Sequence, residues 1–251
     1  MKFALVKIAI AFYLTIGATS AEGDTLPIPK KSWSFEGPTG TFKRDVLQRG
    51  YQVYKEVCSA CHGLNRISYE KLMGIGLSKN AVKALALEHD HPDLTDDGEP
   101  TQRKGIISDK IHSPYANDKA ARASNNGALP PDLSLITKAR TGGPNYVYAL
   151  LTGFCDAPKD TAIMQGMHYN PYFSGRQIAM APPLFEGQVK YADGTKATTA
   201  QMAEDVVTFL SWAAEPEMEQ RKQMGFKVLF YLLILTTVLY LSKRKIWKSV
   251  K

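Results

Sequence analysis

The chain has 251 residues, of which 44% are hydrophobic and 22% charged, a composition typical of a folded protein with one sizeable core and not of a disordered chain. The formal net charge of +7 would suit a nucleic-acid-binding protein, but two of these positive charges lie in residues 1–21 and five in residues 243–251. Since none of the excess remains for residues 22–242, we expect a neutral domain with no nucleic-acid partner.

The N-terminal segment has the layout of a bacterial secretory signal. Lys2 and Lys7 precede an apolar stretch at 8–16, and small residues follow at 17–21. The apolar stretch is too short to span a bilayer comfortably, so we predict a signal peptide over residues 1–21 that is cut after Ala21. A short anchor that stays on the protein is the alternative.

A helix is predicted to lead to position 58. Leu47, Tyr51, Tyr54 and Cys58 recur at helical spacing, and Asp45 lies near the start, where an acidic side chain is favourable. The pattern places Cys58 at the end of the helix, facing the core. A second helix is expected over residues 72–87, with a break at the glycines of positions 74 and 76.

The segment Cys58-Ser-Ala-Cys61-His62 carries two thiols and an imidazole, which could hold a metal, perform redox chemistry or attach a cofactor. A zinc site would need about four ligands, and the chain has no second Cys/His pair at suitable spacing. A thioredoxin-type pair would need a βαβ setting, which the preceding helical pattern contradicts. Cys-x-x-Cys-His is the attachment pattern of a c-type haem, whose iron the imidazole reaches. One such motif predicts one covalently bound haem c, and the export signal agrees with it.

Residues 88–133 are rich in Pro, Gly, Asp and Asn and predict a long irregular excursion over the surface. The excursion begins with an acidic run that contains no Lys or Arg, made of Glu88, Asp90, Asp93, Asp96, Asp97 and Glu99. This run is either a solvated loop or a docking patch for a basic partner.

The end of this excursion, Leu129-Pro-Pro-Asp132, is stiff enough to present a backbone carbonyl to the second ring nitrogen of His62, although it could equally be a plain loop. A further helix is predicted from Pro144 to near Gly153. Haem propionates are anionic and need donors. The candidate donors, each of which could also be an ordinary surface residue, are Arg122, Arg140 and Tyr146.

The second axial ligand of the iron decides between an electron carrier and a catalyst. A thioether closes the iron and favours electron transfer, whereas an open position would suit a tethered peroxidase or gas sensor. Met180 is the preferred candidate because the following Ala-Pro-Pro stiffens its loop. Met164 and His168 are held in reserve, and Met202 belongs to a helical stripe and is interpreted as core packing.

The C-terminal part predicts a membrane anchor. A helix over residues 198–215 begins with a capping box formed by Thr198 and Gln201. Residues 224–242 are long and apolar enough to span a bilayer, and the Lys-rich tail at 243–251 is expected to stay in the cytoplasm under the positive-inside rule. The domain over residues 22–223 is then periplasmic, on a single-pass protein of the bacterial inner membrane.

Four segments together resemble the cytochrome c1 family, the haem subunits of the quinol:cytochrome c oxidoreductase or cytochrome bc1 complex, in an α-proteobacterial form. They read YKEVCSACHGLNRISY, ASNNGALPPDLSLITKARTGGPNYVYALLTGFC, NPYFSGRQIAMAPPLFEGQVKYADGTKAT and DVVTFLSWAAEPEMEQRKQMGFKV. The resemblance implies a mainly α protein with a class I cytochrome c-like haem domain, large loop insertions and one C-terminal transmembrane helix. It implies haem attachment at Cys58 and Cys61, axial ligation by His62 and Met180, and haem contacts from Asn125, Pro131, Arg140 and Tyr146.

The resemblance also implies a role. The chain is expected to take an electron from the Rieske iron–sulfur protein and pass it to a cytochrome c, beside cytochrome b in a dimeric complex, and to be no enzyme on its own. A basic cytochrome c is expected to dock near the acidic run. The haem subunit of a terminal oxidase or nitric oxide reductase is the alternative. Several bacterial relatives pair the thiol matching Cys155, but the chain has only three cysteines, so we predict a free, buried thiol there.

Overall fold

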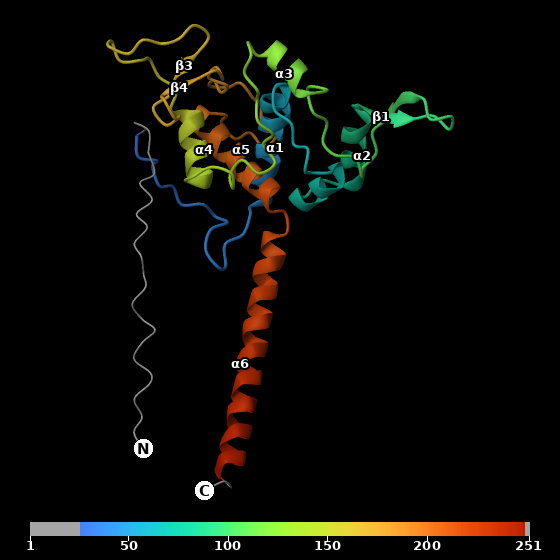
Figure 1. Ribbon diagram of the computed structural model, residues 1–251, viewed down its shortest axis with the longest axis vertical. Coiled ribbons are helices and arrows are strands. Elements are labelled where there is room, and N and C mark those ends of the chain that lie inside the picture. The colour runs from blue at the N-terminus through green and yellow to red at the C-terminus, as the bar shows by residue number, and fades with distance from the viewer. Residues whose placement is uncertain (1–25, 249–251) are drawn as a thin grey trace, which may run out of the picture.

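The computed structural model describes residues 26–248, so the predicted signal peptide and the last residues of the basic tail lie outside the described part. The described chain is mainly helical and carries one long C-terminal apolar helix, as expected (Figure 1). Its helices are α1 (Arg44–Glu56), α2 (Lys79–Leu87), α3 (Asp118–Ser124), α4 (Gly143–Thr152), α5 (Thr199–Ala214) and α6 (Met218–Lys248), with the short 3₁₀ helices η1 (Cys58–Ala60) and η2 (Tyr69–Ile75).

The core forms where α1 crosses α5. The predicted stripe of α1 is buried, including Leu47 and Tyr54, and it packs against Phe209 of α5. The two backbones approach so closely that a Cβ atom at Gly50 would lie 2.0 Å from the carbonyl oxygen of Asp205. Only glycine therefore fits at this position of α1.

A buried ion pair lies beside this crossing. The Asp205 carboxylate is fully buried and accepts two hydrogen bonds from the Arg49 guanidinium, at 3.1 and 3.2 Å. Arg49 also donates to Asp193, at 2.7 Å. Burial alone would lower the pKa of Arg49. The hydrogen bonds to Asp205 and Asp193 outweigh this effect and raise the pKa of Arg49 above its ordinary value. The pair links α1 to α5 through a bidentate contact.

The predicted break in the second helix is confirmed at Gly76, whereas Gly74 lies inside a 3₁₀ helix. Residues 69–75 form η2, which ends at Gly76 with a left-handed φ of 94°, and α2 begins afresh at Lys79. The cap of α5 is confirmed in part. Thr198 accepts a hydrogen bond from the backbone N–H of Gln201, but the Gln201 side chain bonds Asp205 and does not return to the cap.

The prediction of an irregular excursion over residues 88–133 is wrong in part. The acidic run lies, apart from Glu88 at the end of α2, on an antiparallel hairpin of β1 (Asp90–Leu94) and β2 (Pro100–Lys104), and residues 118–124 form α3. The strands are mostly exposed and lack an apolar alternation. Ion pairs across the hairpin support it instead, between Asp90 and Lys104 at 2.9 Å and between Asp93 and Arg103 at 3.0 Å.

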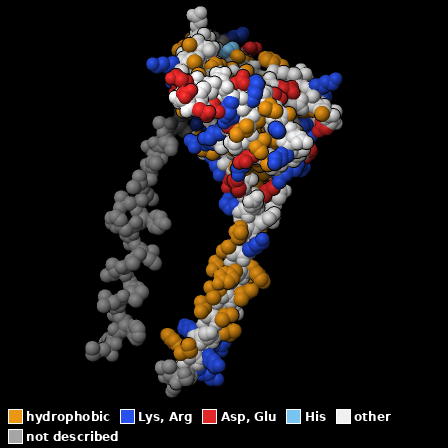
Figure 2. Space-filling model, turned by 90° about the vertical axis from the view of Figure 1, so that its right-hand side faces the viewer, with side chains coloured by type: hydrophobic (Ala, Val, Ile, Leu, Met, Phe, Trp, Pro, Cys, Tyr) orange, Lys and Arg blue, Asp and Glu red, His pale blue; other side chains and the backbone are white. Residues whose placement is uncertain are grey.

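The helix α6 leaves the domain as a single long rod (Figure 1). It is the one helix in the described part that is long and apolar enough to cross a membrane, and its apolar stretch is not buried by the rest of the protein. Apolar side chains cover its middle and Lys and Arg gather at its far end (Figure 2). The helix exceeds the predicted span at both ends, since it starts at Met218 and continues to Lys248.

The crossing of α1 and α5 yields the first testable prediction. Gly50→Ala should lower the free energy of unfolding by about 3 kcal/mol, because the added methyl group meets backbone that cannot move aside. Thermal unfolding of the full-length protein in detergent measures the change. Gly225→Ala in α6 is the matched control, since nothing lies within 4 Å of its Cβ position. Equal melting temperatures for the two variants would contradict the close approach.

Candidate haem site

The two cysteines of the motif lie on one tight turn. The helix α1 ends at Glu56, and Cys58 begins η1, so the prediction that Cys58 ends the helix is wrong by one short turn. The carbonyl of Cys58 accepts hydrogen bonds from the backbone N–H groups of Cys61 and His62, at 3.1 and 2.9 Å. Both thiols are free; Cys58 packs half-buried against the core and Cys61 is exposed. Burial, with a smaller contribution from Cys61, raises the pKa of Cys58 to about 12.

The imidazole of His62 is oriented by a backbone carbonyl. Its Nδ1 lies 2.8 Å from the carbonyl oxygen of Pro131, so Nδ1 carries the proton and donates it to this bond. Burial lowers the pKa of His62, against a smaller opposing effect of the Pro131 bond. Burial therefore favours the neutral ring, with Nε2 in the form that binds a metal.

The loop that carries Pro131 is fastened to the segment following the motif. The Asp132 carboxylate accepts hydrogen bonds from the backbone N–H groups of Asn65, at 2.7 Å, and Ser134, at 2.9 Å. The N–H of Leu133 donates to the carbonyl of Gly63, at 2.9 Å. Sequence reasoning missed the role of Asp132, although an Asp two residues before a Ser is the pattern of a side chain that bonds its own backbone.

The other residues expected to contact the haem lie on separate segments of the chain. Asn125 lies directly after α3, and its amide group donates to the hydroxyl of Tyr115 at 3.0 Å and to the carbonyl of Ala121 at 2.7 Å. Tyr146 is half-buried on α4, and burial raises its pKa. The positive charge of Arg140 opposes that shift.

The arginines proposed for the propionates are both exposed. Arg140 donates to the carbonyl of Ala139, at 3.0 Å, and Arg122 donates to the carbonyl of Gly127, at 2.9 Å. Each guanidinium therefore has one N–H group bonded to a nearby backbone carbonyl.

The candidates for the second axial ligand differ in their surroundings. Met180 is half-buried and lies two residues beyond β4 (Gln177–Ile178), which pairs with β3 (His168–Tyr169). Met164 is 62% exposed, whereas Met202 is fully buried in the core of α5. His168 is half-buried on β3.

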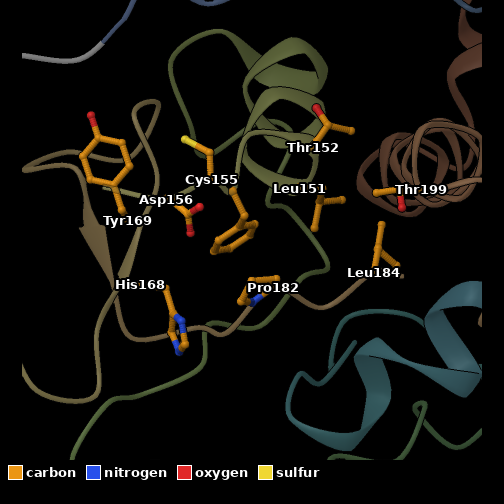
Figure 3. A pocket seen from close by; sticks show the side chains of 10 residues that line it. Leu151, Thr152, Cys155, Asp156, His168, Tyr169, Pro182, Leu184 and Thr199 are labelled. Atoms are coloured by element: carbon orange, nitrogen blue, oxygen red, sulfur yellow. The ribbon is translucent and has the colours of Figure 1, made fainter. Parts of the chain in front are cut away.

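A cavity of about 530 Å³ borders the loop of Met180. Its walls are formed by the end of α4, the strand β3, the segment after Met180 and the start of α5 (Figure 3). Cys155 lies on this wall, and it is exposed, so the prediction of a buried thiol is wrong. The cause is local: α4 ends at Thr152, and the residues after it run along the rim of the cavity.

The residue types present fit a covalent haem. Among residues 26–248, no group of three or more His, Cys, Asp or Glu side chains could hold a metal ion by itself. A porphyrin supplies the equatorial ligands, so that one neutral imidazole and one thioether complete the iron. The free thiols of Cys58 and Cys61 would provide the two attachment points of such a group, and the oriented His62 would hold its iron.

Two thiols and an oriented imidazole on one turn, with a long apolar C-terminal helix, define a membrane-anchored c-type cytochrome. The profile of the Cytochrome C1 family matches residues 33–250. The chain is 45% identical over 262 residues to cytochrome c1 of Rhodospirillum rubrum, across 97% of this chain and 96% of that protein. It is 48% identical over 240 residues to the mitochondrial cytochrome c1 haem protein of Saccharomyces cerevisiae, across 95% of this chain and 78% of that protein. The chain belongs to the cytochrome c1 family.

Membership of this family gives the class of function. The chain is an electron-carrier subunit of the cytochrome bc1 complex and carries one covalent haem c, with Cys58 and Cys61 as the attachment pair. The expectation of an electron-transfer subunit that is no enzyme on its own is confirmed. The alternatives of an oxidase subunit, a nitric oxide reductase subunit, a peroxidase or a gas sensor are set aside.

The fastening of the Pro131 loop yields a second prediction. Asp132→Ala should lower the free energy of unfolding by about 1.5–3 kcal/mol, because two backbone N–H groups lose a charged acceptor. Asp132→Asn should lie between wild type and Asp132→Ala, since an amide keeps one acceptor oxygen. Chemical denaturation of the full-length protein measures both, with Asp160→Ala, at an exposed position, as control. A loss no larger than that of Asp160→Ala would contradict the role of Asp132.

Proposed function

We propose that this protein takes one electron from the Rieske iron–sulfur protein and passes it to a cytochrome c, as an α-proteobacterial type of cytochrome c1. The observation that carries the proposal is the hydrogen bond from His62 to the Pro131 carbonyl beside two free thiols. It occurs in a chain that also carries a helix long and apolar enough to cross a membrane. A bound haem c supplies the reversible change of iron charge. The protein supplies the neutral ligand nitrogen, the attachment points and a fixed position.

The axial ligands are proposed to be His62 and Met180. The carbonyl of Pro131 keeps the His62 proton on Nδ1, which leaves Nε2 for the iron and makes the imidazole a better ligand. Met180 is half-buried, and the following Pro182 and Pro183 limit the conformations of its loop. A thioether at the second position closes the iron to exchange and favours electron transfer.

The substitution Met180→Leu tests this ligand pair. It should remove the low-spin optical spectrum and lower the reduction potential, because leucine has no donor atom. Redox-titrated spectra of the purified membrane complex measure both. Met164→Leu, at an exposed methionine of the same part of the chain, is the control and should leave spectrum and potential unchanged. A low-spin spectrum that persists in Met180→Leu would contradict the assignment of Met180 as an axial ligand. Carbon monoxide binding to the reduced native protein would also contradict it.

The proposed domain organisation follows from the distribution of charge and apolar residues. We assign residues 1–21 to a signal peptide, 22–223 to a periplasmic haem domain, 224–242 to the membrane span and 243–251 to a cytoplasmic tail. The Lys and Arg residues at the far end of α6 support this orientation, because such clusters stay in the cytoplasm (Figure 2). Within the complex, cytochrome b would cover the apolar face of α6, and the assembly would be a dimer.

The electron acceptor is proposed to be a basic cytochrome c that docks near the acidic run. Three members of the run form ion pairs within the protein. Glu88 pairs with Lys55 at 2.8 Å, and across the hairpin Asp90 pairs with Lys104 and Asp93 with Arg103. Asp96, Asp97 and Glu99 lie at the exposed turn between β1 and β2, which narrows the docking patch to that turn.

Neutralising the turn tests the docking patch. The double variant Asp96→Asn, Asp97→Asn should slow the reaction with a basic cytochrome c at low salt by about tenfold, and the difference should shrink at high salt as screening increases. Stopped-flow rates at several ionic strengths measure this. Asp160→Asn removes an acidic charge elsewhere on the surface and is the control. If the double variant and the control react alike at low salt, the turn is ordinary surface.

A further inference from the structure

The junction between the haem domain and the membrane helix is short. The helix α5 ends at Ala214 and α6 begins at Met218, so only three residues, including Pro216, join the two. Such a linker fixes how far apart the helices lie. The direction of α6 against the domain then depends on side-chain contacts made by its first turns.

Lys222 makes the most restrictive of these contacts. Its ammonium group donates to the carbonyl oxygens of Phe35, at 2.7 Å, and Gly40, at 2.9 Å, and the side chain is half-buried. The loop at 35–40 is shaped to present these oxygens. The ring of Phe35 is buried and stacks on that of Phe42 at 4.9 Å, and a Cβ atom at Gly40 would lie 1.9 Å from the carbonyl oxygen of Glu36.

Residues 35–43, which include this loop and lead into α1, are called the N-terminal arm below. Glu219, one turn earlier on the same helix, binds the end of this arm next to α1. One of its carboxylate oxygens accepts the backbone N–H of Phe42, at 2.7 Å, and the other accepts the guanidinium of Arg44, at 2.5 Å. Arg44 is the first residue of α1, the helix that leads to the haem motif. The membrane helix is thus bound through Glu219 to the helix that positions the cysteines.

Two ion pairs tie the linker itself to other parts of the domain. Glu217 pairs with Lys71 of η2 at 2.6 Å, and Glu215 pairs with Lys138 at 3.1 Å. These contacts reach the junction from regions more than 70 residues away along the chain. They are more exposed than the contacts of Lys222 and Glu219, so water and salt weaken them more.

We propose that Lys222 and Glu219 are positioning residues for electron transfer, which lock the direction of α6 against the haem domain. The lock holds the haem plane at one angle to the membrane and at one distance from the membrane-bound electron donor. Both residues act through the N-terminal arm and α1, and neither reaches the haem motif itself.

The orientation of the haem in aligned membranes tests the lock directly. Electron paramagnetic resonance of the full-length protein in oriented bilayers reports the spread of haem angles about the membrane normal. Lys222→Met should broaden this spread, because methionine fills a similar volume but donates no hydrogen bond. Lys222→Arg, which keeps the charge and the donors, should restore a narrow spread in part. Lys227→Met, at an exposed position further along α6, is the control.

The second measurement is the rate of electron transfer from quinol to the haem in the assembled complex. Lys222→Met and Glu219→Ala should slow this step by about tenfold or more, since small misplacements of reacting groups are costly. The haem spectrum and reduction potential should stay unchanged. A spread of angles and a rate equal to those of Lys227→Met would overturn the proposal, and so would a shifted potential, because the effect would then act through the haem pocket. The kinetic test rests on the proposed function, whereas the orientation test does not; a broadened spread with an unchanged rate would uphold the lock and count against its role in electron transfer.

Discussion

The close crossing of α1 and α5 is the constraint on which the rest of the structure depends. The backbones meet at Gly50 and Asp205, where no side chain fits between them, and the Arg49–Asp205 pair fixes the crossing beside that point. The chain that leaves α1 forms the haem motif within two residues, and the chain that leaves α5 forms the membrane helix within four. One contact between the two ends of the domain therefore sets where the haem lies and where the anchor starts. Removing Arg49 would leave the fully buried Asp205 carboxylate without its positively charged partner, which costs about 3–5 kcal/mol.

Sequence patterns predicted the helices of this contact from local signals. The apolar stripe of α1 recurs at helical spacing, and the capping residue Thr198 marks the start of α5, which is buried on nearly all sides. The β1–β2 hairpin could not be predicted in this way. Its strands bury little apolar surface and are supported by charges that meet only after the chain folds back, so that Asp90 and Lys104 look like separate parts of a loop in the sequence. Cys155 was misplaced for a related reason, because its exposure depends on the cavity formed by distant segments.

The haem site shows the same division between local and distant information. The Cys-x-x-Cys-His motif could be recognised in the sequence, since the attachment of a c-type haem needs residues of fixed type at fixed spacing. The stiffness of the Pro130-Pro131 segment suggested a carbonyl for His62, and such a bond is present at 2.8 Å. What the sequence did not indicate is how the two segments are joined. Asp132 accepts the backbone N–H of Asn65, and the N–H of Leu133 donates to the carbonyl of Gly63, and these distant backbone groups carry no residue-specific pattern. Side chains of defined chemistry can be predicted from sequence far better than the backbone groups they bind.

A backbone carbonyl in a restricted loop is the acceptor at both functional ends of the domain. Pro131 presents one to His62, and Phe35 and Gly40 present two to Lys222. Both loops have few accessible conformations. Proline rings restrict the loop of Pro131, whereas the stacking of Phe35 on Phe42 and the lack of space for a side chain at Gly40 restrict the loop at 35–40. Little conformational entropy is then lost when the hydrogen bond forms, so that a single bond can orient a long or mobile side chain. A carbonyl also cannot be removed by changing its own side chain. The orientation of the His62 ring and that of the membrane helix should therefore respond to substitutions that reshape these loops more than to changes on the surrounding surface.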